Sequence, residues 1–246
     1  MYDFYLDDTE KGMRRKGYLP ILGGFIMEYN RYPELQNDLW ILKERFGLNK
    51  FDAIKWSPSQ TDQTYRAQRR IPDQNLFRRS VLELLGNYDV TLIISVIDED
   101  ELIRKGSLKY YRSQALEHLS QRFQLFLQDK KVKGQNWGQI ILDYPGHKKE
   151  SFLSKYYRDI CCFGCKHIEM QLRLLSKTLY LAHAFSCEGL QLADYVVGMM
   201  GYTLKNQDKR YYDLVRNKIR NYKGKIKGTG IIIFPSNSKK IDFLFQ

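Results

Sequence analysis

Three aspartates, far apart in the sequence, occupy settings in which a carboxylate could do chemistry. Asp7 ends the first apolar run, Asp143 ends "GQIILD", and Asp194 lies inside the apolar stretch "LQLADYVVG". A charged side chain in such a place is costly unless it is paired or binds a metal. Converging carboxylates repel one another unless a cation lies between them, and Mg²⁺ and Mn²⁺ prefer oxygen ligands. We therefore predict that these aspartates bind Mg²⁺ or Mn²⁺.

Carboxylate-bound metals of this kind can cleave phosphodiesters, since two ions about 3.5–4 Å apart activate water and stabilise the leaving oxygen. Lys55, in "AIKWS", could contact the scissile phosphate or hold an acid in place. Asp8 is the weaker candidate for assisting, because successive strand side chains point to opposite faces. Structural alternatives stay open: aspartate often ends strands because it favours turns, Asp194 could hold a loop, and Lys55 could extend into water.

The residues around these aspartates predict alternating strands and helices. Apolar and β-branched runs predict strands at residues 4–7, 18–27, 51–56, 89–98, 139–143 and 230–234. Apolar residues at three- and four-residue spacing, with helix start and stop signals, predict helices at 33–46, 73–85, 107–128, 150–159, 188–204 and 209–221. We expect one α/β domain over residues 1–246, in which an antiparallel N-terminal hairpin and then parallel strands form a mixed sheet with helices on both faces.

The segments "FYLDDTEKG", "AIKWS", "IILDYP" and "SCEGLQLADYVVG" stand in an order that resembles domain-of-unknown-function family 3800. That family is similar to a divergent branch of the ribonuclease H-like superfamily, and the resemblance covers residues 2–201. It implies a ribonuclease H-like fold and a metal-dependent nuclease of DNA or RNA. The positions that match the family's acids and its strand lysine are Asp7, Asp8, Lys55, Asp143 and Asp194.

Three residues depart from the family's opening pattern. Asp8 stands where the family has Glu, Thr9 where it has Ser, and Glu10 where it has Gly, which tolerates a positive φ that Glu disfavours. The departures at Asp8 and Glu10 favour an alternative function, a catalytically weak or inactive nucleic-acid-binding or interaction module. Such a module would belong to a mobile-element or phage-defence system and would have a protein partner from that system.

The chain is strongly basic, with a formal net charge of +12 and a pI of about 9.4. Lys and Arg contacts to phosphate give sequence-independent affinity for nucleic acid, and interleaved tyrosines can stack on unpaired bases. The alternative is a solvated basic face. The basic residues form one group near residue 70 and another in a C-terminal extension at 203–240. The predicted nucleic-acid-binding residues are Arg66, Arg69, Arg70, Lys209, Arg210, Arg216, Arg220, Lys223, Lys225 and Lys227.

Several other classes of protein receive no support from the sequence. The apolar runs are far shorter than the roughly 20 residues that span a membrane, and no signal peptide is evident. From the short apolar runs we expect no membrane partner. Four cysteines do not make a disulfide scaffold, so the expected compartment is the reducing cytoplasm. Cys162 and Cys165 have a zinc-knuckle spacing without a second such pair, which favours reduced thiols.

Overall fold

The computed structural model describes residues 1–9, 19–98, 111–130, 137–165 and 170–245. Its centre is a sheet of 6 strands in the order β5-β4-β1-β2-β3-β6. The strands are β1 (Tyr2–Asp8), β2 (Ile21–Glu28), β3 (Thr91–Ile97), β4 (Gly138–Asp143), β5 (Leu175–Ala182) and β6 (Ile231–Phe234).

The sheet is mixed, as predicted. β2 lies antiparallel to both β1 and β3, so the chain begins with an antiparallel hairpin. β1 with β4, β4 with β5, and β3 with β6 are parallel pairs. In the parallel pair at the centre Leu6 lies opposite Leu142, so β1 and β4 end side by side at Asp7 and Asp143.

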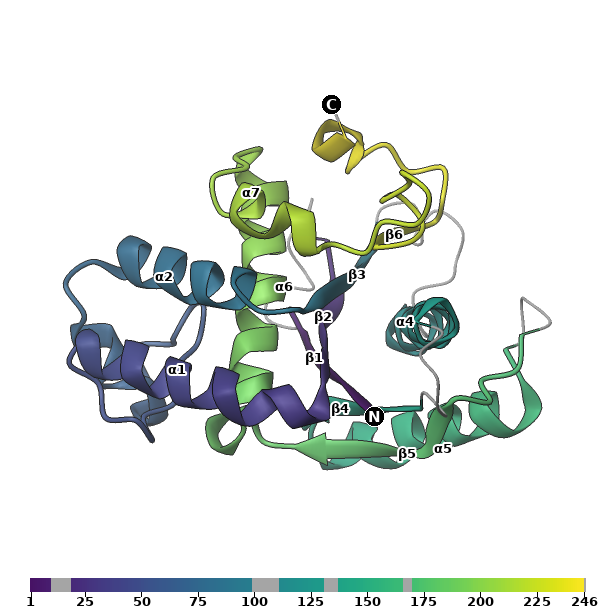
Figure 1. The fold of residues 1–246 in the computed structure, drawn as a ribbon, viewed down its shortest axis with the longest axis horizontal. Coiled ribbons are helices and arrows are strands. Elements are labelled where there is room, and N and C mark those ends of the chain that lie inside the picture. The colour runs from purple at the N-terminus through teal and green to yellow at the C-terminus, as the bar shows by residue number, and fades with distance from the viewer. Residues whose placement is uncertain (10–18, 99–110, 131–136, 166–169, 246) are drawn as a thin grey trace.

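Helices cover both faces of the sheet (Figure 1). One face packs against α1 (Tyr32–Arg45), α2 (Gln74–Gly86) and α6 (Glu188–Asn206), and the other against α4 (Tyr111–Asp129) and α5 (His147–Phe163). A short helix, α7 (Tyr212–Val215), packs on α2 and α6. The predicted helices 33–46, 73–85 and 188–204 are confirmed within a few residues at each end, and Asp73 caps α2 by accepting from the Asn75 and Leu76 backbone N–H groups.

Alternation along β1 sends its side chains to two different cores. Phe4 and Leu6 belong to the core under α4 and α5, whereas Tyr5 belongs to the core under α6. Because side chains two residues apart share a face, Asp3 and Asp7 lie on the Tyr5 side of the sheet. Asp7 therefore faces α6, and Asp8 lies on the opposite face of the sheet.

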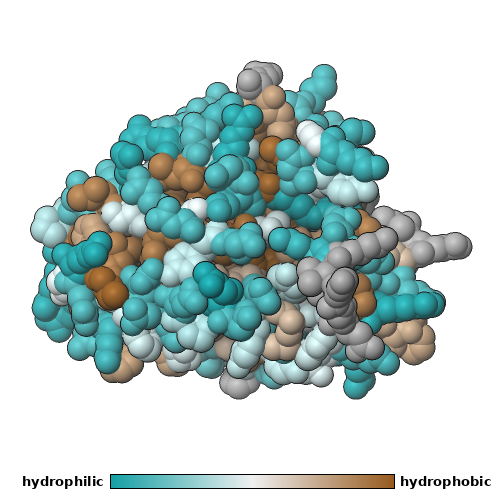
Figure 2. Space-filling view, in the orientation of Figure 1, coloured by the Kyte–Doolittle hydropathy of each residue, from teal (hydrophilic) through white to brown (hydrophobic). Residues whose placement is uncertain are grey.

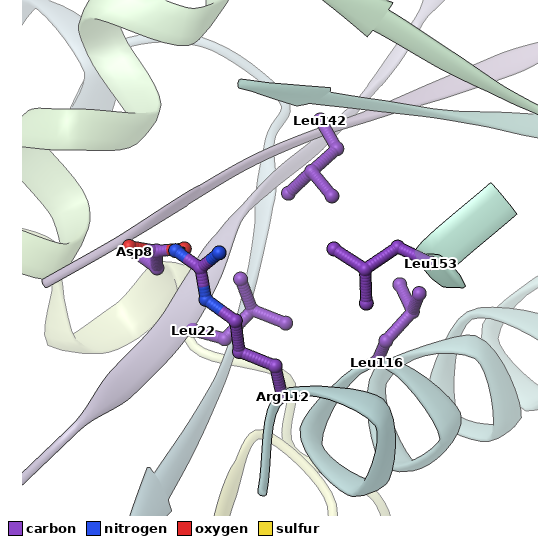
Figure 3. A pocket seen from close by; sticks show the side chains of 6 residues that line it. All are labelled: Asp8, Leu22, Arg112, Leu116, Leu142 and Leu153. Carbon is purple, nitrogen blue, oxygen red and sulfur yellow. The ribbon is translucent and has the colours of Figure 1, made fainter. Parts of the chain in front are cut away.

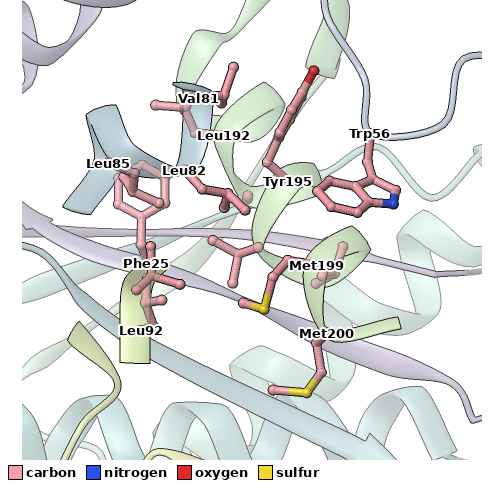
Figure 4. Packing of buried hydrophobic residues seen from close by; sticks show 14 of the residues in the cluster. Phe25, Trp56, Val81, Leu82, Leu85, Leu92, Leu192, Tyr195, Met199 and Met200 are labelled. Carbon is pink, nitrogen blue, oxygen red and sulfur yellow. The ribbon is translucent and has the colours of Figure 1, made fainter. Parts of the chain in front are cut away.

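Helix α6 approaches its neighbours closely at two of its glycines, Gly189 and Gly198. Figure 4 shows the Trp56 ring beside Tyr195 of this helix. A Cβ atom at Gly189 would lie 2.4 Å from the Tyr5 ring, and one at Gly198 would lie 2.1 Å from the Trp56 ring. Real Cβ atoms do not come this near to other atoms. The glycines thus allow α6 to lie against both β1 and the loop that carries Trp56.

Two predicted elements are wrong. Residues 51–56 form a loop rather than a strand, because the backbone N–H groups of Lys55 and Trp56 donate to the side chains of Gln68 and Asp194. Residues 209–221 do not form one helix. After α7 and a single 3₁₀ turn, Ile219 bridges to Leu92 of β3, and the backbone N–H of Arg220 donates to the Leu92 carbonyl.

The face of the molecule seen in Figure 2 is largely hydrophilic, with apolar side chains gathered in patches between polar ones. Among the described residues, no helix combines the length and the apolar character needed to cross a membrane. Residue Glu10 and the predicted helix start at 107–110 lie outside the described residues.

Candidate active site

The site begins where two neighbouring parallel strands end. Asp7 is the last buried residue of β1, with 5% of its surface exposed, and Asp143 is the half-buried last residue of β4. The Ala184 backbone N–H, just beyond β5, donates to Asp143 Oδ1 at 2.9 Å. This hydrogen bond fixes the carboxylate of Asp143 between the ends of β4 and β5.

Helix α6 brings the third carboxylate to the same end of the sheet. Asp194 is 7% exposed, and its Oδ2 accepts a hydrogen bond of 2.5 Å from the backbone N–H of Trp56. The side chain of Asp7 also lies within interaction range of Asp194 and opposes part of the rise that burial causes in the pKa of Asp194. Two carboxyls can share a hydrogen bond only when one of them carries a proton. Asp7 and Asp194 are therefore neighbours that need a cation or a proton between them.

Lys55 supplies the nearest positive charge to these carboxylates. Its Nζ lies 3.9 Å from Asp194 Oδ1. The buried side chain of Gln68 holds the Lys55 backbone from both sides, accepting from its N–H at 2.7 Å and donating to its carbonyl at 2.6 Å. The Gln68 side chain thus makes the two backbone hydrogen bonds that a neighbouring strand would otherwise make. These bonds hold Lys55 with its side chain directed toward the acids.

The electrostatics show how strongly the three acids influence one another. Burial, followed by the charges of Asp194 and Asp143, raises the pKa of Asp7 well above its usual range. Burial also raises the pKa values of Asp143 and Asp194, although the Lys55 charge opposes the shift at all three carboxyls. Burial lowers the pKa of Lys55, but the charges of Asp194 and Asp7 outweigh it, so the net shift is upward. One lysine thus faces three interacting carboxyls.

Asp8 is not brought to this group. It forms an ion pair with Arg112, from the first turn of α4, on the opposite face of the sheet. A small cavity lined by Leu22, Leu116, Leu142 and Leu153 lies beside this pair (Figure 3). The carboxylate of Asp8 therefore has a fixed cationic partner in an apolar setting, whereas Asp7 has other acids.

The fit of a divalent cation can be judged from the donor set. Within the described residues, no group of three or more His, Cys, Asp or Glu side chains is arranged so that it could hold a metal ion. The side chains of Asp7, Asp143 and Asp194 offer only carboxylate oxygens, which are the ligands that Mg²⁺ and Mn²⁺ prefer. Burial, followed by the charges of Asp194 and Asp143, keeps the pKa of Asp7 raised despite the nearby charge of Lys55.

The predicted nucleic-acid-binding residues separate into exposed and engaged side chains. Arg69 donates to the carbonyls of Ser59 and Asp62, and the buried Arg220 is paired with Asp129. Arg210 pairs with Asp208 and Lys227 with Asp242, and Lys209 lies over the Phe243 ring. The exposed members are Arg66, Arg70, Arg210, Arg216, Lys223, Lys225 and Lys227, of which Arg210 and Lys227 are the ion-paired ones.

The two basic groups lie in different parts of the fold. Arg66 and Arg70 flank Gln68, the residue that holds Lys55, and so belong to the surroundings of the three carboxyls. The C-terminal group surrounds β6, which is the edge strand opposite β5 in the sheet order. The first group is therefore the one attached to the candidate site.

Sequence reasoning missed the glutamines that build the site and the histidine beside it. Gln191 accepts from Lys43 Nζ and donates to the Ala184 carbonyl, which ties the start of α6 to the loop after β5. Gln191 and Asp194 are three residues apart on a predicted helix, and such residues are neighbours on its surface. This spacing was the signal from which Gln191 could have been included in the site. The charge of His183 acts on Asp143. The hydrophobic periodicity of residues 167–185 is ambiguous between short strands and an edge hairpin, so the sequence did not predict β5 or this position.

The chain was also compared with known proteins. No protein-family model matches it, and no curated protein matches it. The resemblance to domain-of-unknown-function family 3800 therefore stays a prediction from the quoted motifs.

Proposed function

We propose that this protein is a metal-dependent nuclease that cleaves phosphodiester bonds of DNA or RNA. The observation that carries the proposal is the group formed by Asp7, Asp143 and Asp194 at one end of the sheet. Burial, followed by the charges of Asp194 and Asp143, raises the pKa of Asp7, and carboxyls perturbed in this way cluster at functional sites. Lys55 beside them supplies a cation suited to a phosphate oxygen.

The proposal includes a ribonuclease H-like fold. An antiparallel hairpin followed by parallel strands, with helices on both faces, supports it. So does the position of the three acids, which come from the ends of β1 and β4 and from a helix lying over the same face. The same features are what the resemblance to family 3800 implies.

Each residue of the site has a proposed role. Asp7, Asp143 and Asp194 would hold Mg²⁺ or Mn²⁺, which supplies Lewis-acid activation and charge neutralisation for phosphodiester hydrolysis. Lys55 would orient the substrate phosphate, and Gln68 would hold Lys55 in place. The Trp56 and Ala184 N–H groups would keep Asp194 and Asp143 in fixed orientations.

The test is a cleavage assay on labelled single-stranded and duplex DNA and RNA, with Mg²⁺, Mn²⁺ or a chelator. We expect cleavage by the wild type only with a divalent cation. Asp7→Asn and Asp194→Asn each lose about a hundredfold or more of activity, since weakening even a residue behind a metal ligand costs 10–100-fold. The matched control is Asp3→Asn, on the same strand and face as Asp7 but at its other end, where Tyr5 and Gln139 are its partners.

Equal cleavage by the wild type and Asp7→Asn would overturn the proposed site. No cleavage by the wild type on any substrate would favour the alternative, a binding module without catalysis. In that case salt-dependent binding of nucleic acid remains, because the exposed basic residues act independently of the carboxyls.

A further inference from the structure

An aromatic stack lies directly beside Asp143. Tyr144 follows Asp143 in the chain, and its ring lies 4.8 Å from that of His183, centroid to centroid, with the two ring planes tilted by 59°. His183 in turn stacks on Phe185, with ring centroids 5.1 Å apart and ring planes inclined by 23°. Tyr144 comes from the end of β4, and His183 and Phe185 come from the segment after β5.

The stack ends in a ring that faces solvent. Phe185 is 54% exposed, and its neighbours His183 and Ser186 are exposed as well. Covering a large apolar ring is favourable in free energy, because its surface is then removed from water. The described residues leave about half of this side chain exposed, 54%, although they fix the backbone on either side of it.

That backbone is held by the site itself. The Ala184 N–H donates to Asp143 Oδ1, and the Ala184 carbonyl accepts from Gln191 Nε2 at 3.0 Å. The Ser186 N–H donates to the His183 carbonyl and closes a 3₁₀ turn over residues 184–186. Phe185 is therefore presented by a braced turn, one residue from a direct partner of a site carboxylate.

We propose that this stack is a platform for an unpaired nucleobase, so that the nucleic acid bound at the site is single-stranded or locally opened. The inference rests on the proposed function, because it places the base next to the carboxyls that would act on its phosphate. Aromatic rings bind unpaired bases by stacking without regard to sequence, and a duplex hides the faces of its bases. The basic chain, at +12, attracts the accompanying phosphates.

A nucleobase fits this surface better than a protein does. A stable protein interface buries about 800 Å² on each partner, whereas the stack presents one outer ring face. The stack also begins at Tyr144, the residue next to Asp143 in the chain. The charge of Lys55 opposes the rise that burial causes in the pKa of Asp143, so Lys55 lies near the same acid. A phosphate chain held near Lys55 would bring a base to the ring.

The test is equilibrium binding by fluorescence anisotropy in the presence of a chelator, so that no cleavage intervenes. The probe is a labelled single strand of about 12 nucleotides, compared with its duplex and with an abasic strand of equal charge. We expect Phe185→Ala to weaken single-strand binding about tenfold, and Phe185→Trp to retain it. Phe163→Ala, at an 86% exposed phenylalanine ending α5, serves as the matched control and binds like the wild type.

Three results would overturn the platform: unchanged single-strand binding by Phe185→Ala, equal binding of the abasic strand, or a self-association of the wild type that Phe185→Ala abolishes. The last would assign the ring to a protein contact. Failure of the platform is distinguishable from failure of the nuclease. If Asp7→Asn abolishes cleavage while Phe185→Ala binds normally, only the platform fails; if Asp7→Asn cleaves normally while Phe185→Ala loses binding, only the nuclease site fails.

Discussion

Asp7 and Asp8 are adjacent in the chain, yet the two faces of the sheet surround them differently. Asp8 meets Arg112 on the α4 side, so its charge is neutralised within the fold. Asp7 meets Asp194 and Asp143 on the α6 side, where burial and then their charges raise its pKa. The same residue type thus stabilises one face as an ion pair and leaves the other with excess negative charge.

The difference supports a structural role for Asp8 and the proposed functional role for Asp7. A fold gains stability by pairing a buried carboxylate, and it has done so for Asp8. Unfavourable charge that persists, as at Asp7, is the signature of sites kept for function at a cost in stability. Substitutions on each face of the sheet test whether Asp7 and Asp8 differ in this way.

The largest expected change in stability comes from the paired side. Arg112→Met should lower the free energy of unfolding by about 3 kcal/mol, because it leaves Asp8 charged without its cation in an apolar setting. The two side chains are only 12% and 18% exposed, so water compensates little. Urea denaturation at neutral pH measures the change.

The double variant Asp8→Asn/Arg112→Met is the control for this prediction. It should recover part of the loss, because the uncompensated charge is gone. A double variant as unstable as Arg112→Met alone would show that Arg112 acts through packing, and the contrast between the two faces would then lose its electrostatic basis.

A smaller effect is expected at Lys43, a buried cation on the same face as Asp7. Its Nζ donates to two neutral oxygens, Gln191 Oε1 at 3.0 Å and the Lys50 carbonyl at 3.4 Å. Burial lowers its pKa from 10.5 to about 8, against the charges of Glu188 and Asp52. Between these values the unfolded chain binds more protons, so the free energy of unfolding due to Lys43 rises with pH from about 8 to about 10.5.

Lys43→Met should therefore raise the free energy of unfolding at pH 7 by about 2 kcal/mol and remove this rise with pH. Denaturant titrations at several pH values measure both effects. Lys205→Met, at an exposed lysine of the last turn of α6, is the control and should change neither. An unchanged pH profile in Lys43→Met would contradict the prediction.

Much of the fold could be predicted because its signals are local. The β-branched run of β3, the helix spacing of α1 and the cap of α2 each lie within a few residues of sequence. Residues 51–56 resemble a strand in composition, but their hydrogen-bond partners are side chains of Gln68, Gln191 and Asp194. Hydrogen-bond partners that lie elsewhere in the sequence produce no hydrophobic periodicity within residues 51–56.

The candidate site follows the same division. The predicted strands end at Asp7 and at Asp143, and in the structure the register of β1 with β4 places these two residues side by side. The partner that takes Asp8 away from them, Arg112, is 104 residues distant, and no local pattern indicates it. The aromatic stack at Phe185 was hidden for a similar reason, since it depends on β5 lying next to β4.

The central claim is that Asp7, Asp143 and Asp194 form a divalent-cation site, and thermal unfolding with and without Mn²⁺ tests it most directly. Mn²⁺ should raise the Tm of the wild type and of Asp3→Asn, because a ligand that binds only the folded state stabilises it. Asp7→Asn should be more stable than the wild type without metal, by about 1 kcal/mol, and should gain nothing from Mn²⁺. An Asp7→Asn protein that is no more stable without metal and gains as much from Mn²⁺ as the wild type would contradict the account.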